Sequence, residues 1–506
     1  MLQVRPEKLS LLMLMASTMA GQMPARYTIS GMVLNSVTNE PIRRALVAGG
    51  SSLVFTGADG RFQVANVPEG EAMLAAQKPG FFDIPSSNIR VTVQGSISDV
   101  VLKLAPEARM EGKIVDEDGE PLNNVLVTAL SRRIVEGRRQ LLQQGQATTD
   151  DRGRYRIDGL NAGTFVLRTA ASQVNAFEGL TASGPAEQVY APRYYPDAPD
   201  ASSAQQIELR PGAREELDFK LAAAPGFHIA GSIGAGLPGM MISCENAEGE
   251  SVGVPAINPK TGRFVIHGVP AGTWKLAFQY GNGEQGAYYG SETVTVTSKD
   301  IDGVTIPVQP LPNIPVIAPN SSNGRPEIGV ELENIQSNVR FGIGATMLPG
   351  NLNGFTNVSP GTYRVTVPPF GDGCVDSLNS GNTDLAQDPL IVNAGSPVQP
   401  ITISVRHDCA SLEIATRPNS RGKTAYVVVI PAFSFYRPMM NPVDAGKPLD
   451  LTGLTPGDYS VYAFSSLDNV EYANPEALRE FSGQQITLSP NQHASLTLDV
   501  NETGDH

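Results

Sequence analysis

The sequence is poor in the residues from which many enzymes and metalloproteins build their sites. Its 506 residues include three cysteines, five histidines and one tryptophan. The zinc-protease pattern H-E-x-x-H does not occur. Three scattered cysteines are too few for a cysteine-based metal site. We therefore expect no catalytic residue, no cofactor and no metal site, and predict that the protein is not an enzyme.

Basic charge and long apolar runs are also scarce. A net charge of −14 disfavours binding to nucleic acid or to anionic membrane surfaces. One apolar run, Leu9 to Ala20, follows Arg5 and Lys8 and ends in small residues. Because it is too short to span a bilayer as a helix, we predict that residues 1–20 are a cleaved signal peptide, with an uncleaved leader as the alternative. The mature chain is then secreted, periplasmic or at the cell surface, without membrane insertion.

Turn-forming residues, in contrast, are abundant, with 51 glycines and 39 prolines. Many fall in a phrase that recurs five times and is clearest from Lys260 to Leu276. The phrase predicts a strand that begins with Gly-Arg-Phe or Gly-Arg-Tyr, a tight turn that ends in glycine, and a second strand. Copies four and five keep the tight turn but lack the Gly-Arg residues. The turn glycines are Gly70, Gly163, Gly272, Gly361 and Gly457. A period of about a hundred residues is typical of small β-sandwich domains.

An aromatic residue follows the turn glycine by two positions in four of the five copies. These residues are Phe165, Trp274, Tyr363 and Tyr459, whereas the first copy has Ala72. An aromatic residue at the same position of four copies indicates that this side chain packs in the core of each domain. We therefore predict that Trp274, the single tryptophan, is structural and is not a platform for sugar binding.

The order of motifs in the first two copies resembles the carboxypeptidase regulatory-like domain. A first strand with Gly31-Met32-Val33 or Gly112-Lys113-Ile114 precedes a turn with Pro-Ile or Pro-Leu, a second strand, Gly-Arg-Phe or Gly-Arg-Tyr, and the glycine turn. The resemblance is good over copies one and two, fair over three and weak over four and five. It implies a seven-stranded transthyretin-like β-sandwich, related in shape to starch-binding-like modules and to Cna protein B-type repeats.

The resemblance carries no catalytic residue across, because its motifs are framework residues. No histidine has a glutamate three positions later, so the ligand pattern of zinc carboxypeptidases is absent. We predict an all-β fold: a tandem array of about five small Ig-like or transthyretin-like β-sandwiches after the signal peptide. The predicted bounds are 27–105, 106–223 with a Tyr/Pro-rich insertion, 224–311, 312–409 and 410–502, the last two being divergent.

Two cysteines of the fourth predicted domain, Cys374 and Cys409, are candidates for a disulfide in an oxidising compartment. Such a bond would close a loop and contribute about 3–4 kcal/mol in the chain-entropy model. Cys244 is then left over, in a predicted strand of the third domain.

Paired tyrosines are the most distinctive candidates for a binding surface. The insertion from Val174 to Ser203 contains Y-A-P-R-Y-Y-P, and the third domain has a shorter Tyr-Tyr pair. Either the insertion folds back and its tyrosines cover a sheet edge, or they form an exposed aromatic patch for a sugar or protein partner. The candidate residues are Tyr190, Tyr194, Tyr195, Tyr288 and Tyr289.

Three functions remain compatible with the sequence. The first is a non-enzymatic secreted or cell-envelope scaffold or protein-binding module. The second is an array of carbohydrate-binding modules, by analogy with starch-binding-like folds, and the third is a regulatory partner of a separate peptidase. Fold analogy is a weak warrant for function. The expected partner is a protein or polysaccharide of the cell envelope.

Overall fold

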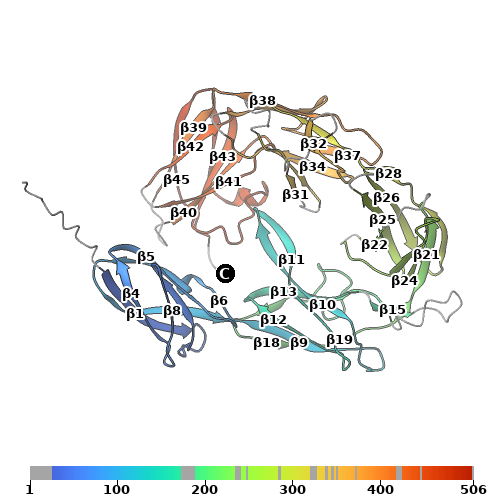
Figure 1. The fold of residues 1–506 in the computed structure, drawn as a ribbon, viewed down its shortest axis with the longest axis horizontal. Helices are drawn as coiled ribbons and strands as arrows, with labels where there is room; N and C mark the ends of the chain where they lie inside the picture. The colour runs from blue at the N-terminus through green and yellow to red at the C-terminus, as the bar shows by residue number, and fades with distance from the viewer. Residues whose placement is uncertain are drawn as a thin grey trace, which may run out of the picture. The chain divides into compact units, whose positions relative to one another are not determined.

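A computed structural model describes thirteen stretches of the chain, and all structural statements below concern these stretches. They are residues 26–170, 172–173, 188–233, 241–246, 249–282, 286–319, 328–336, 340–342, 347–348, 352–370, 373–417, 424–444 and 447–503. The predicted signal peptide, residues 1–20, and residues 174–187 of the predicted insertion lie outside them. Within them the regular structure is almost entirely β-strand, with two short 3-10 helices, η1 (Pro85–Ser87) and η2 (Ala477–Glu480). The all-β prediction is confirmed (Figure 1).

The strands fall into five consecutive groups, which we name sandwich 1 to sandwich 5. Sandwich 1 has the sheets β4-β1-β8-β6 and β3-β2-β5-β7. Its strands are β1 (Arg26–Asn35), β2 (Leu46–Gly49), β3 (Ser52–Phe55), β4 (Arg61–Pro68), β5 (Gly70–Gln77), β6 (Phe81–Phe82), β7 (Asn88–Val93) and β8 (Ile97–Pro106).

Sandwich 2 contains the insertion and has a third, small sheet. The sheets are β11-β10-β13-β16 with β17 beside β13, β12-β9-β18 with β19 beside β9, and β14-β15-β20. Its strands are β9 (Ala108–Val115), β10 (Leu126–Val135), β11 (Arg138–Thr148), β12 (Arg154–Leu160), β13 (Gly163–Thr169), β14 (Ser172–Gln173), β15 (Gln188–Tyr190), β16 (Arg193–Tyr194), β17 (Ile207–Leu209), β18 (Arg214–Glu216), β19 (Phe219–Lys220) and β20 (Ala224–Pro225).

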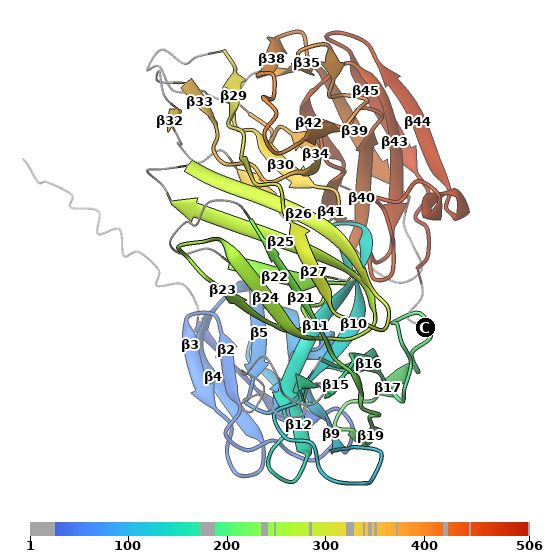
Figure 2. The same ribbon diagram turned by 90° about the vertical axis from the view of Figure 1, so that its right-hand side faces the viewer.

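Sandwich 3 returns to two four-stranded sheets, β23-β24-β21-β27 and β22-β25-β26-β28 (Figure 2). Side chains from both sheets form one core cluster, which includes Phe264, Trp274 and Phe278. Its strands are β21 (Phe227–Ser232), β22 (Met241–Glu245), β23 (Val254–Ile257), β24 (Arg263–Val269), β25 (Gly272–Asn282), β26 (Gly286–Val296), β27 (Ile301–Thr305) and β28 (Gln309–Pro310).

Sandwich 4 pairs the sheet β32-β33-β29-β38-β35-β36 with the sheet β31-β30-β34-β37. Its strands are β29 (Ile314–Ile317), β30 (Glu331–Asn334), β31 (Arg340–Gly342), β32 (Met347–Leu348), β33 (Leu352–Phe355), β34 (Gly361–Thr366), β35 (Cys374–Ser380), β36 (Thr383–Asp384), β37 (Leu390–Val392) and β38 (Ile401–Arg406).

Sandwich 5 pairs the sheet β42-β39-β45 with the sheet β41-β40-β43-β44. Its strands are β39 (Ala410–Thr416), β40 (Thr424–Pro431), β41 (Met439–Asp444), β42 (Leu449–Leu454), β43 (Gly457–Phe464), β44 (Gly483–Leu488) and β45 (His493–Leu498). By compactness the chain divides into two units: the first contains sandwich 1, the second contains sandwiches 3 to 5, and the residues of sandwich 2 are shared between them. We propose that the five sandwiches are five domains.

One strand arrangement recurs in all five sandwiches. The first strand pairs in parallel with a strand near the end of the group, as in β1–β8, β9–β19, β21–β27, β29–β38 and β39–β45. On its other edge the first strand pairs with the strand that carries the recurring phrase or its counterpart, antiparallel in β1–β4, β21–β24 and β39–β42. The divergent fifth copy therefore keeps the framework of the first.

The glycine of the first strand and the aromatic residue of the Gly-Arg-Phe strand pack against each other. A Cβ atom on Gly31 would clash with the Val100 carbonyl of the parallel strand and would lie 2.9 Å from Cζ of Phe62. Gly231 meets Phe264 in the same way, with 2.8 Å to Cζ. The aromatic ring of the Gly-Arg-Phe strand thus covers the backbone of the first strand, which only glycine permits.

A β-bulge ends the phrase strand before its tight turn. In β4, β24 and β42 two residues oppose one residue of the first strand, and the second of the two has a positive φ. These residues are Asn66, Gly268 and Gly453, and Gly159 of β12 has the same conformation. Glycine and asparagine accept this conformation most readily. The bulge turns the next residue into the core, where Val67, Leu160, Val269 and Leu454 are buried.

All four boundaries between the predicted domains are built into sheets or cores. At the first, Ala105 and Pro106 end β8 and pair with β6. Ala224–Pro225 forms β20 and pairs with β15. Gln309–Pro310 forms β28 beside β26, and the next residue, Leu311, is buried. Ala410, just after Cys409, opens β39 and is buried. These junctions are therefore ordered parts of the sandwiches.

Candidate functional site

The repeated aromatic position is a core position with a hydrogen bond back across the turn. The indole Nε1 of Trp274 donates to the carbonyl oxygen of Pro270 over 2.9 Å. The hydroxyl groups of Tyr363 and Tyr459 likewise donate to the carbonyl four residues earlier, at 2.8 and 2.6 Å. All three side chains are at most 5% exposed, and Phe165 is fully buried. Trp274 is structural, as expected from the sequence.

The tyrosines of the insertion do not form an exposed patch, which corrects one of the two interpretations. Tyr190 and Tyr194 are only 4% and 3% exposed. Tyr190 ends β15, which pairs with β14 and β20, while Tyr194 lies in β16, beside β13. The described part of the insertion, residues 188–203, therefore folds back over sandwich 2, because its apolar residues, Tyr194 among them, pack with Leu130 and Val166 of its sheet.

The three remaining candidate tyrosines are half-buried. Tyr195 packs edge-on against Phe219, with ring centroids 5.5 Å apart. Tyr288 packs against the core of sandwich 3 beside Tyr280, with centroids 6.3 Å apart. Tyr289 is paired on both sides, with Gln279 in β25 and Gln309 in β28. The structure does not bring the five predicted tyrosines together into one surface.

One enzyme-like pattern escaped the sequence-based prediction. Residues Gly249 to Gly253 read G-x-S-x-G, with Ser251 at the centre. In a hydrolase this pattern joins a strand to a helix. Here Ser251 forms a bridge with Glu245 between β22 and β23, so the glycines, both with positive φ, belong to a turn between strands. The local structure is that of a β-hairpin turn.

The cysteines are placed as the sequence suggests. Cys374 and Cys409 are bonded to each other, with Cα atoms 5.9 Å apart, within the usual range for a disulfide. Cys244 is a free thiol, 1% exposed, in β22. Burial, and to a lesser extent the nearby Glu245, raises the pKa of its thiol to about 12.

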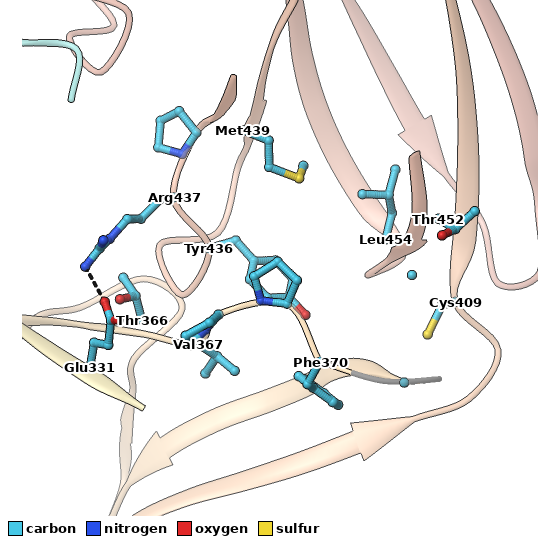
Figure 3. A pocket seen from close by; sticks show the side chains of 15 residues that line it. Glu331, Thr366, Val367, Phe370, Cys409, Tyr436, Arg437, Met439, Thr452 and Leu454 are labelled. Atoms are coloured by element: carbon cyan, nitrogen blue, oxygen red, sulfur yellow. Dashed lines mark hydrogen bonds and ion pairs between the residues drawn. The ribbon is translucent and has the colours of Figure 1, made fainter. Parts of the chain in front are cut away.

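A cavity within the described residues lies where sandwiches 4 and 5 meet. It has a volume of about 750 Å³, within the range of small-ligand sites. Phe370, Tyr436, Met439 and Leu454 line it together with three prolines, and Figure 3 shows their side chains around it. The cavity is therefore mainly apolar.

A polar group of three residues lies at one end of this cavity, which we call the junction pocket. Glu331 of β30 is directly opposite Thr366 of β34 in the sheet, so both side chains are on one face. Arg437 reaches them from sandwich 5, and its Nη2 donates to Oε2 of Glu331 over 2.6 Å (Figure 3). Two buried atoms of the group have no hydrogen-bond partner: Oγ1 of Thr366 and Nε of Arg437.

Such unpartnered atoms are costly, because a buried donor or acceptor loses its hydrogen bonds to water without replacement. Thr366 is only 2% exposed. Its hydroxyl can donate or accept, whereas Nε–H of Arg437 can only donate. Both atoms are closed off from solvent, so they are unpaired inside the junction and are not exposed to the cavity.

A second arginine lies near the polar end. Arg364 of β34 pairs with the buried Glu333 at 3.3 Å. Burial lowers the pKa of Arg364, and the positive charges of Arg138 and Arg437 lower it further. Among the described residues that line the junction pocket, the charged ones are Arg437 and Glu331, and these pair with each other.

Sandwiches 4 and 5 share a core beside the pocket. Phe435 of sandwich 5 belongs to the buried cluster of sandwich 4. It stacks on Phe433, with centroids 4.5 Å apart, and Phe433 also packs against the core of sandwich 5. The amide of Val367 donates to the Phe435 carbonyl over 2.9 Å, and Thr455 Oγ1 donates to the Val375 carbonyl over 2.8 Å.

Sequence reasoning missed the junction pocket, although a signal was available. Its walls come from Val367-Pro368-Pro369-Phe370 and Tyr436-Arg437-Pro438, which combine proline with aromatic residues. The same combination singled out the insertion of sandwich 2. Applied to the whole chain, it would also have marked these two segments. It would not have shown that they face each other.

The described residues contain neither a candidate metal cluster nor a candidate membrane helix. No group of three or more His, Cys, Asp or Glu side chains there is arranged to hold a metal ion. No helix within the same stretches is long and apolar enough to cross a membrane.

Three of the solved structures that are similar to this chain match it at low identity. The Bacillus anthracis TIE protein is 14% identical, with 56% of this chain and 51% of that chain covered and a TM-score of 0.19. A minor pilin of Streptococcus agalactiae is 15% identical, covering 39% and 97%, with a TM-score of 0.23. The major pilin subunit of Bacillus cereus is 10% identical, covering 56% and 99%, with a TM-score of 0.17. Such TM-scores carry no argument about function.

No curated protein matches this chain. The model of the carboxypeptidase regulatory-like domain matches residues 109–222. This segment contains Gly112 in β9 and Tyr155 in β12, whose hydroxyl would lie 3.0 Å from a Cβ atom on that glycine. The match covers the strands of sandwich 2 from β9 to β19. Sandwich 2 is therefore the part of the chain that is similar to the carboxypeptidase regulatory-like domain.

Proposed function

We propose that the protein is a non-enzymatic scaffold or protein-binding module of the cell envelope or the secreted fraction. The observation that carries this proposal is the packed junction of sandwiches 4 and 5. There a shared aromatic core and a disulfide hold an apolar cavity of about 750 Å³. Preformed apolar cavities with a few fixed polar groups are typical of binding sites.

The recurring phrase supports the same view. Its glycines, bulges and aromatic corners are used to build the sandwiches, as the contacts of Gly31, Gly231 and Trp274 illustrate. Disulfides are typical of secreted and envelope proteins, in keeping with the predicted signal peptide. The Cys374–Cys409 bond thus favours an oxidising compartment.

An array of carbohydrate-binding modules is less well supported. Such modules need exposed aromatic rings, whereas Trp274, Tyr190 and Tyr194 are each at most 5% exposed.

Chemical cross-linking in the native envelope tests the proposal. The full chain is cross-linked in intact cells of the source organism, and its partners are identified by mass spectrometry after denaturing purification. We expect cross-links to one or a few envelope proteins. Cross-links only between copies of the chain itself, or peptide hydrolysis that survives rigorous purification, would contradict the proposed function.

A further inference from the structure

We propose that the β10–β11 hairpin of sandwich 2 is a latch: its tip docks on the loop at 465–482 of sandwich 5 and is released while every sandwich stays folded. The hairpin, residues 126–148, and this loop both belong to the second compact unit of the chain. The inference is independent of the proposed function. It rests on the length of the hairpin, the shape of its turn and the few contacts that its tip makes.

The outer part of the hairpin extends past its own sheet. Strand β10 pairs with β13 only from Val127 to Ser131, whereas its pairing with β11 continues to Val135 and Arg138. Residues 132–141 are therefore a ribbon of two strands that pair with each other. A two-stranded ribbon is only marginally stable by itself. We therefore expect its tip to depend on the surface that it contacts.

The turn at the tip allows a close approach by another segment. Glu136 and Gly137 have φ values of 49° and 76°, as in the two-residue turns that join antiparallel strands. A Cβ atom on Gly137 would lie 2.5 Å from Cδ2 of Tyr472 and 2.6 Å from the amide nitrogen of Ala473. Only glycine leaves room for sandwich 5 at this position.

Three contacts join the tip to the loop. The amide of Ala473 donates to the carbonyl oxygen of Gly137 over 3.0 Å. Nε of Arg139 donates to Oε1 of Glu471, which is 332 residues further along the chain, over 2.8 Å. The ring of Tyr472 lies against the turn and also packs on a buried cluster of sandwich 5. The tip is thus docked through both main chain and side chains.

These contacts are few compared with those inside a sandwich or at the junction of sandwiches 4 and 5. The side chain of Arg139 is 50% exposed, and exposed ion pairs contribute little to stability. The junction of sandwiches 4 and 5, in contrast, shares a buried aromatic core. Release of the tip breaks no strand pairing of a sandwich. The latch should therefore open locally, at a lower free-energy cost than the unfolding of any sandwich.

Hydrogen exchange of the purified, oxidised full chain measures this opening. Exchange is followed by mass spectrometry for the loop peptide that contains Ala473 and for a peptide from β43. In the wild type, the slow amide of the loop peptide should exchange at a rate that low concentrations of urea leave unchanged, as expected for local opening. The β43 amides should exchange more slowly, at a rate that rises with urea.

A pair of glycine variants tests the docking of the turn. Gly137→Ala places a methyl group where Tyr472 and Ala473 lie, and should speed exchange of the loop amide about tenfold, the equivalent of roughly one hydrogen bond. Gly119→Ala is the matched control. Gly119 also has a positive φ, 89°, in a turn of sandwich 2, but a Cβ atom there has no neighbour within 4 Å. It should leave the loop amide unchanged.

A charge swap tests the ion pair without touching the turn. Arg139→Glu and Glu471→Arg should each speed exchange of the loop amide about two- to fivefold, the range for an exposed ion pair. The double variant restores opposite charges and should return exchange towards the wild-type rate.

Several results would overturn the inference. These are equal loop exchange in the wild type and Gly137→Ala, a double charge swap as fast as the single variants, or the same urea dependence for the loop and β43. Loop protection that grows with protein concentration would also do so, because the hairpin would then dock on a second copy of the chain.

Discussion

The indole of Trp274 and the carbonyl of Pro270 are joined by a 2.9 Å hydrogen bond that closes the tight turn of sandwich 3. A Cβ atom on Gly272, between them, would lie 3.2 Å from the indole ring. The ring thus folds back over the turn. Tyr363 and Tyr459 make the equivalent bond in their own copies. The aromatic position of the phrase therefore closes a turn as well as filling a core.

Trp274→Ala should lower the free energy of unfolding of sandwich 3 by about 3–5 kcal/mol, because a buried aromatic side chain is lost. Trp274→Phe keeps most of the packing and should cost less, with about 1 kcal/mol from the lost hydrogen bond. Differential scanning calorimetry of the full chain measures both. A sugar platform would instead leave stability intact and abolish polysaccharide retention.

Gly31→Ala should destabilise sandwich 1 by about 1–3 kcal/mol or more, because the added methyl group meets the Val100 carbonyl and the Phe62 ring. Gly95→Ala is the matched control, since a Cβ atom there has no neighbour within 4 Å. Hydrogen exchange of the β1 and β8 amides provides the measurement. Equal protection in the two variants would show that the close approach of β1 and β8 is wrong.

Cys374 and Cys409 should be recovered as a disulfide-linked peptide from the secreted protein. The double variant Cys374→Ser/Cys409→Ser should lose about 3–4 kcal/mol, the chain-entropy value for a separation of 35 residues. Non-reducing mass mapping and urea unfolding test the two parts. Free thiols at both positions in freshly secreted protein would refute the pairing.

Cys244 should resist alkylation by iodoacetamide at pH 8.5 until the protein is unfolded, because its thiol is buried and its pKa is raised to about 12. The folded state retains this proton more strongly than the unfolded state, in which the pKa has its ordinary value of 9.0. The stabilisation is therefore complete below pH 9 and is lost as the pH rises from 9 towards 12. Rapid native labelling at pH 8.5 would contradict the burial of Cys244.

Thr366→Val should raise the stability of sandwiches 4 and 5 by about 1 kcal/mol, because it removes a buried hydroxyl that has no partner. Thr455→Val is the opposite case: its hydroxyl is also buried but donates to the Val375 carbonyl. That variant should lose about 1–3 kcal/mol. Urea unfolding of both compares them, and a loss of stability in Thr366→Val would mean that its hydroxyl has a partner.

The sequence predicted the features that local chemistry determines. The alternation Phe264-x-Ile266, the glycine turn and the aromatic at Trp274 each follow from a few neighbouring residues, so the sandwiches and their number could be read from the repeat. The parallel pairing of β1 with β8 was not predictable in this way. It joins residues far apart in the chain, and its only local trace is Gly31.

The junction pocket could not be predicted from the sequence either, because it also depends on contacts between distant residues. Glu331, Thr366 and Arg437 belong to three separate segments, and only the fold brings them together. The hypothesis that the tyrosines of the insertion are exposed was wrong for a different reason. Their composition suggested exposure, but Tyr194 found an apolar surface on its own sandwich. Composition identifies a distinctive loop and does not fix which way it folds.

The parallel pairing of the first and last strands also determines how a sandwich responds to tension along the chain. In β1–β8, β21–β27 and β39–β45 the chain enters along one strand and leaves along its parallel neighbour, so entry and exit are at opposite ends of the pair. Tension along the chain would shear this ladder, whose evenly spaced hydrogen bonds would share the load instead of opening one by one. Each such sandwich would then resist extension as a small load-bearing link.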